Sequence, residues 1–134
     1  MALRDTDVEQ KGTSLLGQRI VLGITGGIAA VETVRLARAL RREGAELTVI
    51  MTNAAQRIIT PLAVRWASQA EVITDWDGDL SALNHADAVL VAPATRDVMA
   101  SHLHGLQLGP LMMALSVARS RNTPIVMVPS MHQD

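Results

Sequence analysis

The chain has 134 residues, 49% of them hydrophobic and 19% charged, so we expect one domain with a packed core. Its formal net charge of −1 offers no basic field to attract nucleic acid or an anionic membrane surface. The absence of cysteine excludes disulfides, thiolate metal sites and a cysteine nucleophile within these residues. Two tryptophans are the only aromatic residues, so nucleic-acid binding by base stacking is not expected.

The start of the chain is polar and mixed in charge. We predict an N-terminal arm over residues 1–18, followed by a single domain over residues 19–134. The apolar runs fall far short of the ~20 residues that span a bilayer, and the start lacks the pattern of a signal peptide. We therefore expect a cytoplasmic protein with no membrane partner.

Short apolar runs alternate with helical patterns along the rest of the chain, which predicts buried strands separated by amphipathic helices. Pro93 should end the fourth strand and Pro129 the fifth. In chain order the predicted elements are strand Arg19–Ile24, helix Ile28–Glu43, strand Glu46–Met51, a helix from about Ala54, helix Leu62–Ser68, strand Val72–Thr74, strand Ala88–Ala92, helix Asp97–Leu103, helix Leu111–Arg119 and strand Pro124–Val128.

This alternation predicts a mostly parallel sheet with helices on both faces. With right-handed crossovers it becomes a doubly wound α/β fold, Rossmann-like or flavodoxin-like, with strand order 3-2-1-4-5. In such a sheet the ligand lies at the carboxyl edge, where the strand order reverses. The turns Thr25–Ile28 and Pro93–Asp97 should therefore face each other across one crevice.

The turn Gly23–Ile28 is rich in glycine and leads into a helix. Backbone N–H groups at such a turn can approach an anion, and the helix N-terminus adds partial positive charge. Thr25 and Ile28 occupy the second and third glycine positions of a dinucleotide fingerprint, and no P-loop Gly-Lys-Ser/Thr follows. A phosphate monoester is therefore a better candidate than a dinucleotide or ATP, with a plain strand-to-helix turn as the alternative.

Other polar segments carry weaker signals. Thr52 and Asn53 could offer a hydroxyl and an amide to the same phosphate, or could simply cap a helix. The acidic loop Asp75–Asp79 lacks the glycine and glutamate positions of an EF-hand. His102 and His104 are two residues apart, so on a helix they point to different sides. We expect no metal site.

Three segments, taken together at their spacings, resemble the flavin-containing cysteine decarboxylases. That family includes phosphopantothenoylcysteine decarboxylase and the peptidyl-cysteine decarboxylases of lantibiotic maturation, with the flavin prenyltransferases as more distant relatives. The resemblance implies flavin mononucleotide (FMN) as cofactor. The segments are Arg19–Thr52, Ala86–Thr95 (ADAVLVAPAT) and Pro124–Met131 (PIVMVPSM).

The resemblance also implies which residues contact FMN. Arg96 replaces a small residue of the family's flavin turn, so it could crowd the site, contact phosphate or contact a neighbouring subunit. Pro129–His132 match the start of the family's Pro-x-Met-Asn substrate clamp, with His132 in place of asparagine. The implied cofactor-binding residues are Thr25, Gly26, Gly27, Ile28, Thr52, Pro93, Ala94, Thr95, Arg96, Asp97 and Met131.

Two departures from the family concern catalysis. The family's catalytic histidine lies fourteen residues before the flavin-turn proline, where this chain has Asp79; His85 could serve only if the loop were rearranged. The family's substrate flap, with its cysteine, and a sixth strand would lie beyond Asp134, so we expect the domain to lack both. We assign catalysis to Asp79, as a shielded base, and to His132.

The resemblance implies an FMN-dependent carboxy-lyase that acts on a cysteine carboxyl. The expected substrate is phosphopantothenoylcysteine of coenzyme A biosynthesis, with a peptidyl cysteine as the alternative. Two other functions stay open: an FMN-binding or regulatory flavoprotein without decarboxylase activity, and a flavin prenyltransferase. Family members form homotrimers, or dodecamers built from trimers, with flavin at subunit contacts, so we expect the same assembly.

Overall fold

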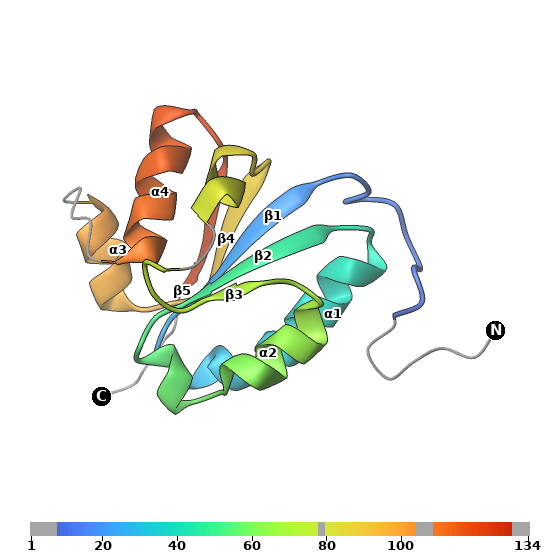
Figure 1. The fold of residues 1–134 in the computed structure, drawn as a ribbon, viewed down its shortest axis with the longest axis horizontal. Helices are drawn as coiled ribbons and strands as arrows, with labels where there is room; N and C mark the ends of the chain where they lie inside the picture. The colour runs from blue at the N-terminus through green and yellow to red at the C-terminus, as the bar shows by residue number, and fades with distance from the viewer. Residues whose placement is uncertain (1–7, 78–79, 104–108, 130–134) are drawn as a thin grey trace.

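The computed structural model describes residues 8–77, 80–103 and 109–129 (Figure 1). Within these residues one five-stranded sheet has the order β3-β2-β1-β4-β5, and all neighbouring strands are parallel. The predicted α/β fold and strand order are confirmed. The strands are β1 (Arg19–Ile24), β2 (Glu46–Met51), β3 (Val72–Ile73), β4 (Ala88–Ala94) and β5 (Ile125–Pro129).

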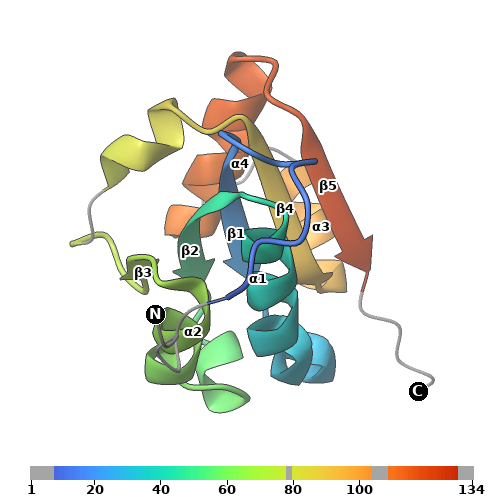
Figure 2. The ribbon, with the colours of Figure 1, turned by 90° about the vertical axis from the view of Figure 1, so that its right-hand side faces the viewer.

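Helices cover both faces of the sheet, as Figures 1 and 2 show. One face packs against α1 and α2, and the other packs against α4 and η3. The helices are α1 (Thr33–Arg42), α2 (Pro61–Ser68), α3 (Arg96–Leu103) and α4 (Pro110–Ser120), with the short 3-10 helices η1 (Ile28–Glu32), η2 (Ala55–Arg57) and η3 (Leu80–Asn84).

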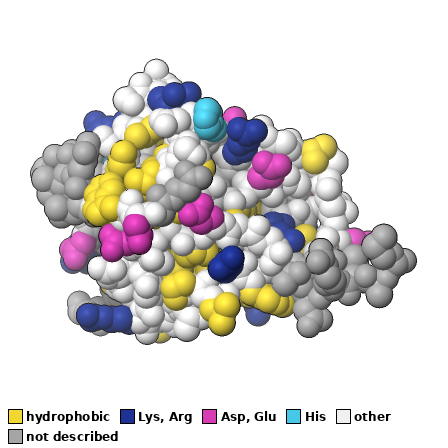
Figure 3. Space-filling model, in the orientation of Figure 1, with side chains coloured by type: hydrophobic (Ala, Val, Ile, Leu, Met, Phe, Trp, Pro, Cys, Tyr) yellow, Lys and Arg dark blue, Asp and Glu magenta, His cyan; other side chains and the backbone are white. Residues whose placement is uncertain are grey.

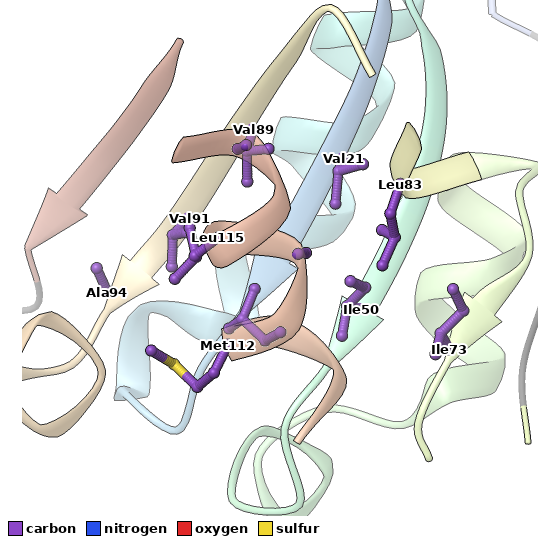
Figure 4. Packing of buried hydrophobic residues seen from close by; sticks show 12 residues of the cluster. Val21, Ile50, Ile73, Leu83, Val89, Val91, Ala94, Met112 and Leu115 are labelled. Carbon is purple, nitrogen blue, oxygen red and sulfur yellow. The ribbon is translucent and has the colours of Figure 1, made fainter. Parts of the chain in front are cut away.

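The central strands supply side chains to two separate cores. Val21 and Ile50 belong to the cluster beneath α4, whereas Leu22 belongs to the cluster beneath α1 and α2. Because successive side chains on a strand face opposite sides, a strand covered on both faces must be apolar throughout. Figure 4 shows the α4 side, where Leu115 lies beside Val91 of β4.

Gly23 interrupts the apolar run of β1 for a packing reason. A Cβ atom at this position would lie 2.5 Å from Cδ1 of Leu111, at the start of α4. The missing side chain therefore lets α4 sit close to the sheet near its carboxyl edge. Gly23 contributes to the position of α4, in addition to opening the glycine-rich turn.

Two strand predictions were wrong in detail. Pro93 does not end its strand: β4 continues to Ala94 through a cis peptide bond, and its register with β5 shifts between Val91 and Ala94. Such an irregularity tolerates a proline, which cannot donate to a regular ladder. The fifth strand is not buried, since Val126 and Val128 are 54% and 50% exposed. In the part of the sheet that the structure describes, β5 is an edge strand.

The helix predicted over Ile28–Glu43 is split into η1 and α1. The Thr33 hydroxyl donates a 2.7 Å hydrogen bond to the carbonyl oxygen of Ala30, at the point where the two meet. The helix predicted from Ala54 is only the single turn η2. The helices α2, α3 and α4 match their predictions to within one residue, whereas η3 was not predicted.

The described part of the predicted N-terminal arm packs along the C-terminal end of α1. The N–H of Lys11 donates to the carbonyl oxygen of Arg42, and that of Leu15 to Glu43, both at 2.9 Å. The last carbonyls of a helix have no partner within the helix, so the arm satisfies groups that would otherwise need water. Gly44 then turns the chain with φ of +95°.

We predict that Gly44→Ala destabilises the protein by about 2–3 kcal/mol, because a left-handed conformation and a crowded Cβ add together. The new Cβ would lie 2.9 Å from Cα of Leu16. Gly17→Ala is the matched control. The φ of Gly17 is +77°, but no atom lies within 4 Å of the added Cβ, so stability should fall by only about 1 kcal/mol. Urea denaturation followed by circular dichroism measures both. Equal losses would contradict the contact between the arm and Gly44.

Candidate functional site

Three turns meet at the carboxyl edge of the sheet, where the strand order reverses. They follow β1 at Thr25–Gly27, β2 at Thr52–Ala54 and β4 at Thr95. Adjacent parallel strands end at the same edge, so residues about 70 positions apart in the chain become neighbours, as the Thr25–Thr95 hydrogen bond shows.

The Thr25 side chain links the β1 and β4 turns. Its hydroxyl donates to the carbonyl oxygen of Pro93 and accepts a 3.0 Å hydrogen bond from the N–H of Thr95. The backbone N–H of Thr25 also donates to Pro93, at 3.3 Å. Thr25 is only 1% exposed, so these bonds are shielded from water. The predicted meeting of the two turns is confirmed.

Gly26 brings the β2 turn against the β1 turn. A Cβ atom on Gly26 would lie 2.5 Å from Cβ of Ala54 and 3.3 Å from its carbonyl carbon. The N–H of Thr52 donates a 3.0 Å hydrogen bond to the carbonyl oxygen of Ile24, which joins the same two turns. Glycine is therefore required at position 26 because two backbones approach closely there.

Each of these turns begins a helix. Gly27 precedes η1, and the Thr52 hydroxyl accepts a 3.2 Å hydrogen bond from the N–H of Ala55, at the start of η2. The Thr95 hydroxyl caps α3 by accepting from the N–H of Val98 at 3.3 Å. The helix-cap interpretation of Thr52 thus holds structurally. The first N–H groups of a helix have no intrahelical partner and carry partial positive charge, so the edge suits an anion.

The other sequence-predicted residues lie at different depths. Pro93 and Ala94 are buried in β4, whereas Arg96 and Asp97 are exposed at the start of α3. Ala94 pairs with Pro129 across the sheet, so the Pro129–His132 segment begins beside the β4 turn. Asp79, Met131 and His132 lie outside the described residues.

His85 lies at the wrong edge for the catalytic role considered above. It lines a small hollow together with Arg19 and Glu46, the first residues of β1 and β2. Because η3 returns the chain to the beginning of β4, a residue just before that strand must lie at the amino edge. The structure therefore argues against His85 as a substitute for the missing histidine.

One histidine on α3 has a perturbed pKa. Burial, and then the positive charge of Arg119, lower the pKa of His102 from its usual 6.5. The Arg119 guanidinium also donates a 3.2 Å hydrogen bond to the backbone carbonyl of His102. A neutral His102 near pH 7 is therefore compatible with this contact between α3 and α4.

Sequence reasoning missed a cleft of about 330 Å³ beside the β2 turn. Thr52 and Asn53 line it, together with Trp76 of the loop after β3 and Leu111 of α4. An aromatic side chain in a polar loop was the available signal for this cleft. A larger hollow of about 820 Å³ lies beside α2 and β3, but none of the three turns lines it.

The chain matches the Flavoprotein family over residues 8–134. It belongs to the flavoprotein family. A relative is the coenzyme A biosynthesis bifunctional protein CoaBC of Thermococcus kodakarensis, 39% identical over 129 residues. The match covers 91% of this flavoprotein but only 32% of that relative, so the chain spans about a third of its length.

Solved structures share the fold of this flavoprotein. The FMN-dependent cysteine decarboxylase SpaF superposes with a TM-score of 0.80 at 24% identity, covering 89% of this chain and 71% of that one. A PPC decarboxylase mutant complexed with pantothenoylaminoethenethiol superposes with a TM-score of 0.73 at 20% identity, covering 87% and 68%. At these identities the likeness establishes the fold.

The described part of the flavoprotein lacks two features that would indicate other kinds of site. Its helices there are too short or too polar to cross a membrane. Its histidines and carboxylates there form no group of three or more that could hold a metal ion.

We predict that Thr25→Val destabilises the flavoprotein by about 1–3 kcal/mol, because the partly buried N–H of Thr95 loses its acceptor. Thr25→Ser keeps the hydroxyl and should lose less. Thr33→Val is the matched control, since its buried hydroxyl bonds only to Ala30, three residues earlier. Amide hydrogen exchange should show faster exchange at Thr95 only in Thr25→Val. Unchanged exchange there would contradict the link between the turns.

Proposed function

We propose that residues 19–134 form an FMN-binding domain and that the three converging turns hold the cofactor. The hydrogen-bonding groups at these turns fit the phosphate of FMN. Three helix starts direct N–H groups and partial positive charge to this edge. The Thr52 hydroxyl donates only a long 3.4 Å hydrogen bond to the carbonyl oxygen of Ile24, which a phosphate oxygen would replace. The close contact of Gly26 with Ala54 draws two of these turns together around one position.

The proposed contacts fall into two groups. The turns after β1 and β2 would bind the phosphate, and the β4 turn with the segment after β5 would flank the rest of the cofactor. The strand order supports this division, because β2 lies on one side of β1 whereas β4 and β5 lie on the other. The residues are Thr25, Gly26, Gly27, Ile28 and Thr52 for the first group, and Pro93, Ala94, Thr95, Arg96, Asp97 and Met131 for the second.

The proposed activity is that of an FMN-dependent carboxy-lyase acting on the carboxyl of a cysteine, with phosphopantothenoylcysteine as substrate. The observation that carries this proposal is the Thr25 link between the β1 and β4 turns, found in a chain 39% identical to a coenzyme A biosynthesis protein. FMN, when bound, supplies the two-electron oxidation of the cysteine thiol that precedes loss of carbon dioxide.

The chain's own residues would position both ligands. Thr25 fixes the β4 turn, and the pairing of Ala94 with Pro129 starts the predicted substrate clamp beside that turn. Asp79 would act as the base and His132 would contact the substrate; both lie outside the described residues. The loop that leads to Asp79 begins at this edge, because Trp76 lines the cleft next to Thr52.

We propose a cytoplasmic homotrimer, alone or within a dodecamer. Ile28 and Val31 support a subunit contact, since they lie on η1, just after the glycine-rich turn, and are 65% and 51% exposed. Apolar side chains left exposed beside a binding site are common at protein contacts. A contact there would place the proposed FMN site at a subunit boundary.

We predict that Thr52→Ala weakens FMN binding roughly tenfold, because a hydrogen bond to a charged phosphate is lost. Riboflavin, which has no phosphate, should bind the variant and the native protein equally. Thr60→Ala is the matched control: the Thr60 hydroxyl accepts from the N–H of Ala63 to cap α2. Isothermal titration calorimetry at fixed salt measures each affinity. An equal loss for FMN and riboflavin would contradict a phosphate contact.

We predict that Asp79→Ala slows carbon dioxide release from phosphopantothenoylcysteine by about 10²- to 10⁴-fold, the usual contribution of a general base. FMN should stay bound, and Asp77→Ala should keep most of the activity. Full activity of Asp79→Ala would contradict the assigned role.

The same assay separates the alternative functions. If the native protein binds FMN but releases no carbon dioxide, a non-catalytic flavoprotein is the better description. Prenylation with dimethylallyl phosphate would identify a prenyltransferase.

A further inference from the structure

A groove of about 470 Å³ lies between α1 and α2, on the face of the sheet opposite α4. Figures 1 and 2 show these two helices side by side on that face. The described residues of the three carboxyl-edge turns do not line this groove, so it lies outside the proposed cofactor site. Arginines and a tryptophan line it, and both residue types are enriched where proteins contact one another.

Three arginines of α1 form one wall of the groove. Arg35, Arg38 and Arg42 are three and four residues apart, which is the spacing that places side chains on one face of a helix. At a rise of 1.5 Å per residue, this arginine stripe extends about 10 Å along the helix. Glu32 lies 3.9 Å from Arg35. The groove therefore carries three positive charges and one negative charge, in a chain whose net charge is −1.

An apolar surface lies beside the arginine stripe. Trp66 of α2 is 40% exposed, and the Arg38 guanidinium lies 4.9 Å from its ring centroid. Leu62 lies one turn before Trp66 on the same side of α2 and is 76% exposed. Val31, which also lines the groove, belongs to the proposed subunit contact, so the docking surface is centred on Arg38 and Trp66. Figure 3 shows hydrophobic and basic side chains next to one another around α2.

The shape and charge of the groove select the kind of partner. Exposed apolar side chains flanked by arginines match an amphipathic helix whose apolar face is bordered by carboxylates. A concave surface between two helices fits a rod more closely than it fits the plane of a bilayer, onto which a protein presents an outward apolar face. A nucleic acid is disfavoured because the chain has no overall basic charge.

We propose that this groove docks an acidic amphipathic helix of a partner protein. The apolar face of that helix would cover Trp66 and Leu62. Its carboxylates, spaced three and four residues apart, would pair with the arginine stripe, because a guanidinium group can hold a carboxylate through two parallel hydrogen bonds. The inference needs neither FMN nor decarboxylation, so it goes beyond the proposed function.

Fluorescence anisotropy of a labelled synthetic peptide, titrated with the full chain, provides the first test. The probe is an amphipathic helix with leucines on one face and glutamates beside them, and its binding should weaken as salt is added. Arg35→Gln combined with Arg42→Gln should weaken binding roughly three- to tenfold, the combined loss of two exposed charge pairs. Arg57→Gln combined with Arg121→Gln is the matched control, since neither residue lines the groove.

Tryptophan fluorescence gives an independent readout of where the peptide binds. Trp76→Phe leaves Trp66 as the single reporter, and Trp66→Phe leaves Trp76. The peptide should protect Trp66 from quenching by acrylamide and leave the accessibility of Trp76 unchanged. A peptide of the same composition in scrambled order, and one with lysine in place of glutamate, should protect neither.

The outcomes separate this inference from its rivals and from the proposed function. Equal peptide binding by the groove variant and its matched control would overturn the inference. Protection of Trp66 by vesicles of phosphatidylglycerol, but not by the peptide, would instead indicate a membrane surface. A change in the oligomeric state of the groove variant alone, measured by sedimentation, would indicate a contact between copies. FMN binding should be the same in the groove variant and the native protein, so failure of either proposal leaves the other standing.

Discussion

The buried hydroxyl of Thr25 donates to the carbonyl oxygen of Pro93 and accepts from the N–H of Thr95, and the site depends on this pair of hydrogen bonds. Parallel strands bring turns to one edge of a sheet, but they do not fix the distance between them. Thr25 fixes that distance for β1 and β4, and the missing side chain of Gly26 does so for β1 and β2. The three turns thereby form one surface.

In the proposed function, that surface would attract an anion through its backbone. Helix starts after Gly27, Thr52 and Thr95 direct N–H groups to the same edge, so the proposed phosphate recognition would need no cluster of lysine or arginine. This agrees with a chain whose net charge is close to zero. The cleft beside Thr52 has the opposite character, with an apolar floor and an acidic rim.

Hydrophobic periodicity and turn residues predicted the fold well, because β1, β2 and β4 are mostly apolar and alternate with helices. In a chain too short for an α/β barrel, that pattern favours a doubly wound sheet with helices on both faces. The detail at Pro93 could not be predicted, since the register shift with β5 that accommodates it depends on the neighbouring strand. The sequence identified Thr25 as part of a turn, but the role of its hydroxyl depends on a residue 70 positions away. The cleft at Trp76 was missed because its lining comes from three separate segments, none of which carries a motif.

The central claim is that these turns form a single anion-binding surface, and backbone amide chemical shifts during titration with inorganic phosphate and then FMN test it most directly. The account predicts that the amides of Gly26–Ile28, Thr52–Ala54 and Thr95–Arg96 shift together, with one saturation curve for each ligand. Shifts that instead gather at the amino edge, around Arg19, Glu46 and His85, or that saturate separately in the three turns, would contradict it.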